Sequence, residues 1–139
     1  MDSMVMSERA NAFTRSFRTL WGEYAVMIRQ SIGAERGGSA DLRQLSPRLD
    51  SKAEEIGNAV APFYGTETAN ALTNLLKQRE HLDARAIAEL LKQPKLSPAL
   101  NDFVAAERRH DDLNAILSQA FAVSDAISMD LEMRFPDRF

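Results

Sequence analysis

The sequence predicts an all-α protein, a single domain folded as an up-down-up-down four-helix bundle. Apolar residues recur at spacings of three and four along most of the chain, and no segment alternates apolar and polar residues as a strand does. Short connections between long helices favour antiparallel neighbours. The length of 139 residues suits one domain. We place it at residues 7–135, between a disordered or frayed N-terminus at 1–6 and a C-terminal tail at 136–139.

The first helix is expected to begin near Ser7, a residue type that favours N-caps, and to end near Gly33. A glycine-rich segment at 33–39 has the composition of a loop. The apolar residues of this helix fall on one stripe, which predicts its buried face. They are Phe13, Phe17, Leu20, Trp21, Tyr24, Ile28 and Ile32.

The second helix has Ser39 or Ser46 as its N-cap and two prolines within its span. Either the segment before Pro47 is a separate short turn, or Ser46 caps the main helix and Pro47 lies in its first turn. The apolar stripe consists of Leu42, Leu45, Leu49, Ala53, Ile56, Val60 and Phe63. Pro62 should loosen the last turn, and Gly65 should end the helix, with Thr66 capping the next one.

The third helix is expected at 67–92, with a leucine-rich core side. That side consists of Leu72, Leu75, Leu76, Leu82, Ile87, Leu90 and Leu91. Residues 93–98 form a turn, and Ser97 followed by Pro98 starts the fourth helix. The fourth helix should reach Met133, because no helix breaker interrupts the segment before Pro136. Its apolar residues lie on more than one face, which suggests a dimer surface.

Composition and charge exclude several classes of protein. The net charge of -3 argues against nucleic-acid binding, which needs a basic surface. With 0 cysteines, neither a disulfide framework nor a thiolate metal site can form. No apolar run is long enough to predict a membrane span, so we expect no membrane partner. The first residues do not resemble a secretory signal, and we therefore expect a cytoplasmic protein.

Six polar residues fall on or beside the predicted core stripes, at about the same level of the bundle. They are Tyr24, Arg79, Asp83, Glu107, His110 and Asp111. Arg79 and Asp83 are four residues apart, so one helix would let them pair. Two interpretations stay open. The cluster is either a structural ion-pair network or a ligand pocket or metal site in the bundle centre.

Glu107 and His110 have the Glu-x-x-His spacing that places two metal ligands on one helix face. Di-iron bundles need this motif twice, whereas here it occurs once in a chain with 2 histidines. These two residues are therefore weak metal candidates, and we predict no cofactor. No phosphate-binding loop or nucleophile motif is present, which favours a protein that is not an enzyme.

Residues 55–65 (EIGNAVAPFYG) resemble the block DIGNAIxPYYG of an uncharacterised family of bacterial helical-bundle proteins. The segment 72–76 (LTNLL) is similar to a second block of that family. The segment 20–24 (LWGEY), with Arg29 and Ile32, is similar to its opening block. Asp125 and the segment 134–136 (RFP) resemble its closing segment. The resemblance covers the first three helices well and the last loosely, and it implies a helical fold.

Some members of this family carry a glycosyltransferase label, but a chain this short and helical cannot hold a nucleotide-sugar fold. Tyr24 and Arg79 stand where members tend to have histidines, and residues 116–119 lack the later histidines. A segment before the last helix is also shortened. If the family histidines form a metal or polar centre, this chain has a tyrosine–arginine–carboxylate centre instead.

Our first hypothesis is therefore a non-enzymatic helical bundle that acts through an unknown protein partner or as a homodimer. It rests on the lack of a catalytic set and on the apolar residues spread around the last helix. The alternative is a bundle that binds a metal or a small ligand at Arg79, Glu107 and His110.

Overall fold

The computed structural model describes residues 8–37 and 42–139, and within them it is all-α, as predicted. These residues form six α-helices and two short 3-10 turns, with no strand. The helices are α1 (Glu8–Gly37), α2 (Leu42–Tyr64), α3 (Thr66–Leu76), α4 (Ala84–Leu90), α5 (Leu96–Arg109) and α6 (Leu113–Arg134). The turns are η1 (Arg79–His81) and η2 (Pro136–Arg138). The predicted caps Ser7 and Ser39 and the segment 1–6 lie outside the described residues.

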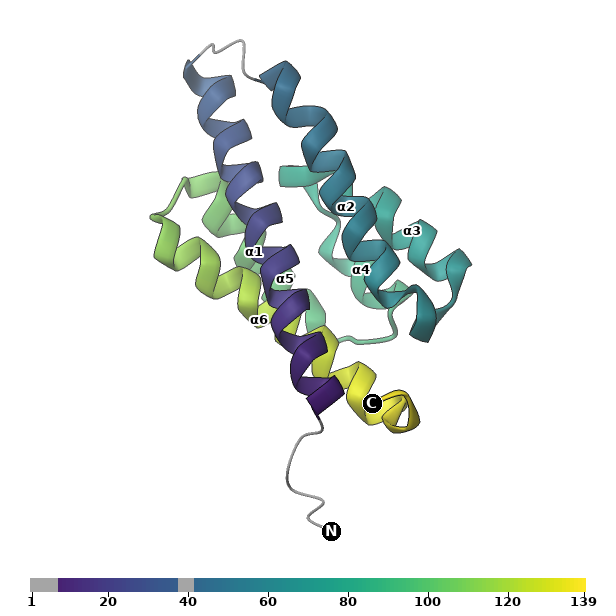
Figure 1. Cartoon of the computed structure of the whole chain (residues 1–139). Coiled ribbons are helices and arrows are strands. Elements are labelled where there is room, and N and C mark those ends of the chain that lie inside the picture. The colour runs from purple at the N-terminus through teal and green to yellow at the C-terminus, as the bar shows by residue number, and fades with distance from the viewer. Residues whose placement is uncertain (1–7, 38–41) are drawn as a thin grey trace.

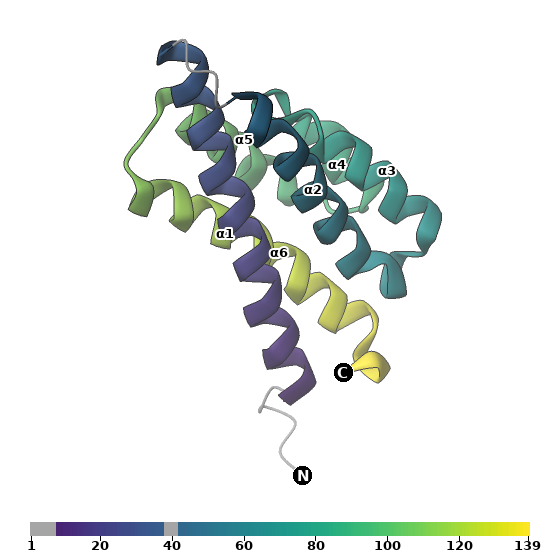
Figure 2. The same ribbon diagram turned by 45° about the horizontal axis from the view of Figure 1, so that its top comes forward.

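α1 lies at the centre of the arrangement (Figures 1 and 2). It packs against α2 on one side and against α6, which crosses it at an angle. α3 packs on the far side of α2, and α5 packs on α6 and α4. The start of α1 and the end of α6 lie at the same end of the molecule (Figures 1 and 2). No helix among the described residues is both long and apolar enough to cross a membrane.

The predicted apolar stripe of α1 is its buried face. Phe17, Trp21, Tyr24 and Ile28 have no exposed surface, and Ile32 has almost none. The helix does not end near Gly33, as expected, but continues to Gly37. Glycine in a helix costs about 1 kcal/mol relative to alanine. Gly33 lies against the His110 ring, so packing in this part of the fold outweighs that preference.

α2 is one continuous helix that contains both Pro47 and Pro62. Neither expected arrangement of Pro47 is correct, because the helix begins five residues before it, at Leu42. The predicted apolar positions in the middle of this helix are buried, from Leu45 to Val60. The reversal after Tyr64 is confirmed, since Gly65 has a φ of 94°. Gly65, rather than Thr66, is the N-cap residue of α3.

The prediction of one helix over 67–92 is wrong, because the chain breaks between α3 and α4. Arg79 has a φ of 58°, which no α-helix accommodates. The side chain of Asp83 then accepts a hydrogen bond of 3.0 Å from the Ala86 backbone N–H and caps α4. The predicted leucine face therefore belongs to two separate helices.

The prediction of one helix from Ser97 to Met133 is also wrong. α5 begins at Leu96 and ends at Arg109, and the next residue, His110, has a left-handed φ of 56°. The side chain of Asp112 accepts a hydrogen bond of 2.9 Å from Ala115 N–H and caps α6. The four expected helices are thus six, since two of them are each interrupted by a turn with an aspartate cap.

Residues 136–139, expected as a tail, fold back onto the helices. The Phe139 ring stacks on Phe63 with centroids 5.2 Å apart and an interplanar angle of 10°. The Phe139 ring also packs edge-on against the Phe13 ring, with centroids 5.7 Å apart. The Arg138 guanidinium donates a hydrogen bond of 2.9 Å to the Pro62 carbonyl. These contacts hold the end of the chain against α1 and α2.

The close contact between α2 and α3 depends on Gly57. A Cβ atom at this position would lie 1.9 Å from Thr73 Oγ1 and 3.0 Å from the Ala69 carbonyl oxygen. The Thr73 hydroxyl is itself held by a 3.0 Å hydrogen bond to that carbonyl. The two helices can therefore approach this closely only where one of them lacks a side chain.

We expect Gly57→Ala to lower the free energy of unfolding by about 1–3 kcal/mol, because the added methyl forces α2 and α3 apart. Urea denaturation followed by circular dichroism measures the change. Gly33→Ala is the matched control, since its Cβ would lie 3.5 Å from His110 Nε2, an ordinary contact. Adding Thr73→Ala should recover part of the loss. Equal stability of the two single variants would contradict the close-packing argument.

Candidate functional site

The six predicted polar residues are placed by separate local contacts, starting with Tyr24 on α1. Its ring is fully buried, 5.6 Å from Trp21 and 6.5 Å from Phe103 between centroids. Its hydroxyl donates to the backbone carbonyl of Leu76, the last residue of α3. A carbonyl at the end of a helix lacks an intrahelical partner, so Tyr24 supplies one.

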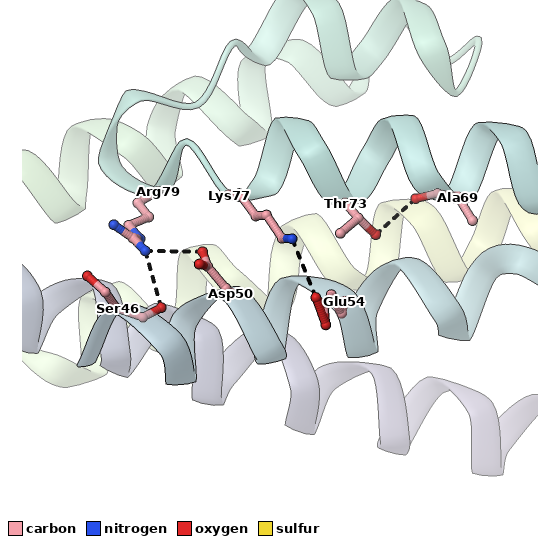
Figure 3. A network of polar contacts seen from close by, with 7 residues as sticks. All are labelled: Ser46, Asp50, Glu54, Ala69, Thr73, Lys77 and Arg79. Atoms are coloured by element: carbon pink, nitrogen blue, oxygen red, sulfur yellow. Dashed lines mark hydrogen bonds and ion pairs between the residues drawn. The ribbon is translucent and has the colours of Figure 1, made fainter. Parts of the chain in front are cut away.

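Arg79 binds α2 and not Asp83 (Figure 3). Its Nη2 donates to Asp50 Oδ1 at 3.1 Å and to the Ser46 carbonyl at 3.2 Å. Lys77 Nζ forms a similar ion pair with Glu54 Oε1 at 3.4 Å, one turn further along α2 (Figure 3). The expected pairing of Arg79 with Asp83 along one helix is wrong, because no helix joins the two residues. Asp83 is exposed and caps α4.

Glu107, His110 and Asp111 lie where α5 ends. The Glu107 side chain is fully buried. His110 Nε2 lies 3.2 Å from the Arg29 carbonyl, and Arg29 Nε donates to the Asp111 carbonyl at 3.1 Å. The Asp111 carboxylate accepts a 2.7 Å hydrogen bond from Arg109, which holds the pKa of Asp111 below its usual value. These contacts fix the turn between α5 and α6 against α1.

Neither metal candidate is part of a larger ligand set. In residues 8–37 and 42–139, no group of three or more His, Cys, Asp or Glu side chains is arranged to hold a metal ion. Glu107 and His110 therefore gain no further ligands of these types from the described neighbouring helices. The polar residues singled out by the sequence act mainly at helix ends and turns.

A different feature stands out on α6, a row of residues spaced by four that forms a ridge inclined to the helix axis. We call it the α6 row, and it consists of Leu113, Leu117, Phe121, Asp125, Met129 and Met133. Leu113 is 45% exposed, Met129 60% and Met133 80%. Among the described residues, these three are the only large hydrophobic side chains that are exposed. Large apolar side chains gathered on one exposed surface are typical of contact sites.

A shallow groove of about 430 Å³ lies beside the N-terminal half of the α6 row. Leu117 and Phe121 line it from α6, and Gly22, Val26 and Met27 line it from α1. A Cβ at Gly22 would lie 3.3 Å from the Phe121 ring, so this glycine keeps the two helices close. The groove is also lined by polar side chains, which are Arg18, Thr19, Glu23, Gln30 and Arg48.

An ion pair lies halfway along the α6 row. Arg18 on α1 binds the Asp125 carboxylate through two hydrogen bonds of 2.7 and 2.6 Å. The hydrogen bonds and charge of Asp125 raise the pKa of Arg18. The guanidinium carbon also lies 5.9 Å from the centre of the Phe121 ring. The one charged residue in the row is therefore neutralised by a partner on α1.

The C-terminal half of α6 is held by a polar cluster at the end of α2. The Tyr64 hydroxyl donates to Asp130 at 3.0 Å and accepts from Gln93 at 3.2 Å. Arg134 binds the same Asp130 carboxylate at 3.0 Å and also donates to the carbonyls of residues 91 and 92. Burial, together with the charge of Asp130, raises the pKa of Tyr64. The row is thus displayed on a helix fixed at both ends.

Comparison of this chain with known proteins does not assign it to a family. No protein-family model, no curated protein and no solved structure matches this chain. The resemblance at residues 55–65 therefore stays a sequence-based prediction. The structure does give physical roles to two of its glycines, since Gly57 permits the α2–α3 contact and Gly65 makes the reversal.

The sequence did not single out Met129 and Met133. Apolar residues on several faces of the last helix were recognised, but the two methionines were not among the core residues named. The signal was present in the spacing, because five apolar residues and one aspartate follow each other at intervals of four. Deciding which of the apolar rows is exposed required the position of α1 against α6.

We expect Tyr64→Phe to lower stability near pH 8 by about 1 kcal/mol, because the hydrogen bond to Asp130 is lost. The pKa of Tyr64 is raised in the folded protein. Its contribution is therefore complete below the unfolded pKa of about 10 and is lost as pH rises above it. The difference in the free energy of unfolding between wild type and variant should be the same at pH 8 and pH 9 and smaller at pH 11, as measured by urea denaturation. A difference that stays constant or widens would contradict this assignment.

Proposed function

We propose that this protein is not an enzyme and acts through protein–protein contact at the α6 row. One observation carries the proposal: the exposed large hydrophobic side chains of the described residues all lie on this row. Burying apolar surface contributes roughly 25 cal/mol per Å², so a partner that covers the row gains affinity. Methionine adapts its shape to a partner, which suits an interface.

The setting of the row supports a contact site. α6 is a 22-residue helix held by α1 along its inner side and by the Tyr64 cluster near its end. A surface on a rigid element loses little conformational entropy on binding. The groove beside Leu117 and Phe121 adds a recessed apolar area to the exposed methionines. Together they provide both a protruding and a recessed part for a partner.

Several broader expectations belong to this proposal. We describe the fold as an up-down-up-down four-helix bundle whose third and fourth helices are each interrupted. We place the protein in the bacterial cytoplasm. The partner is a second copy or another protein, and neither nucleic acid nor a membrane is part of the proposal.

We do not propose the alternative of a metal or ligand centre. It needs Arg79, Glu107 and His110 to converge on one site. Arg79 is bound to Asp50 on α2, and His110 is bound to the Arg29 carbonyl.

In-cell photo-cross-linking tests the proposal without assuming a partner. A photoreactive amino acid replaces Ala122, which is exposed between the two halves of the row, or Asn74, which is exposed on α3 as a control position. We expect a covalent protein adduct at position 122 and none at 74. Adding Met129→Glu and Met133→Glu should reduce the adduct about tenfold or more, because each buried methionine contributes about 1.5 kcal/mol or more.

The matched control variant is Asn70→Glu with Asn74→Glu. These residues have the same spacing of four, are exposed, and receive the same two charges on a different helix. They should leave the adduct at position 122 unchanged. No adduct at position 122, or equal adducts at 122 and 74, would overturn the proposed function.

A further inference from the structure

We infer that the partner covering the α6 row is a second copy of this chain, antiparallel to the first about a two-fold axis at Asp125. This inference rests on the proposed function, since it names the partner for the same surface. Two-fold dimers are the commonest oligomers, and they require a surface that is complementary to itself. The α6 row meets this requirement.

The two halves of the row differ in shape. On the C-terminal side of Asp125, Met129 and Met133 protrude, with 60% and 80% of their surface exposed. On the N-terminal side, Leu117 and Phe121 are only partly exposed and line the groove of about 430 Å³ shared with α1. One half therefore offers protruding side chains, and the other offers a recess.

The spacing makes these halves match in an antiparallel pair. Phe121 and Met129 each lie four residues from Asp125, and Leu117 and Met133 each lie eight residues from it. With the two-fold axis at Asp125, Met129 of one copy faces Phe121 of the other, and Met133 faces Leu117. Each copy places its two methionines in the groove of the other copy, so the two-fold axis produces two identical contacts. A parallel pair would instead set methionine against methionine and leave both grooves open.

Helix geometry favours the same arrangement. Residues spaced by four form a ridge inclined to the helix axis. Two copies of such a ridge pack into each other's grooves with the helices crossing at about −50°, the commonest class of helix packing. The crossing point lies at the middle of the row, where the small side chain of Ala122 is exposed.

The charge at the axis is balanced. Two Asp125 carboxylates near a two-fold axis would repel each other if they were bare. Each is bound at 2.6–2.7 Å by Arg18 of its own chain, so two neutral pairs meet. The guanidinium of one copy then lies near the carboxylate of the other, which makes an alternating ring of four charges.

Single cysteines test the geometry cleanly, because the chain has 0 cysteines of its own. The variants are Ala122→Cys, Ser118→Cys and Met133→Cys, all at exposed positions of α6. Each is treated with a short bismaleimide and analysed by mass. We expect Ala122→Cys to form a cross-linked dimer by itself, since it lies beside the axis.

Ser118→Cys and Met133→Cys should each fail to cross-link alone but should cross-link when the two purified variants are mixed. In the antiparallel pair, residue 133 lies near residue 118 of the other copy but about 24 Å along the helix from residue 133 of that copy. In a parallel pair, Met133→Cys alone would cross-link. That result, or a mixture that fails to react, would overturn the antiparallel geometry.

Sedimentation equilibrium of the purified protein accompanies the cross-linking. We expect a dimer, shifted to monomer by Met129→Glu with Met133→Glu and unchanged by Asn70→Glu with Asn74→Glu. A monomer at all concentrations would overturn the second copy as partner. The proposed function would survive that result if the in-cell adduct at position 122 contained a different protein and exceeded the adduct at position 74. It would fail if no adduct formed or if the two positions gave equal adducts.

Discussion

The buried contact of Trp21 and Tyr24 on α1 with Phe103 on α5 is the constraint on which the rest of the fold depends. The ring centroids lie 6.1 and 6.5 Å apart across the two helices, and all three side chains are fully buried. Aromatic pairs contribute about 0.5–1.5 kcal/mol beyond the area they bury. Because α1 is also the helix against which α2 and α6 pack, this contact joins α5 to the helix that those two share.

The exposed α6 row follows from that central position. α1 covers one side of α6, where Ala120, Val123, Ile127 and Leu131 are buried. α6 also carries apolar side chains outside that face, and Met129 and Met133 remain exposed there. Gly22 on α1 lets the two helices approach closely beside Phe121, which leaves the ring at the edge of a groove rather than in the core. The side chains of the proposed interface are therefore those that α6 does not bury when its other face packs in the core.

The two residues that stand where the resembling family tends to have histidines have clear local roles here. Tyr24 donates a hydrogen bond to the end of α3, and Arg79 ties the turn after α3 to the start of α2 through Asp50 and the Ser46 carbonyl. Both act on the α3–α4 connection.

The sequence by itself determined the helical class, the buried stripes of α1 and α2 and the reversal at Gly65, because these depend on local spacing and backbone preference. It did not determine that α3 and α5 end early. Asp83 and Asp112 were local cap signals, but leucine periodicity continues across the first break and no helix breaker marks the second. The pairing of Arg79 with Asp83 was wrong for the same reason, since residues four apart pair in this way only along an unbroken helix. Only the tertiary structure decided which apolar row of α6 is buried, because that depends on where α1 lies.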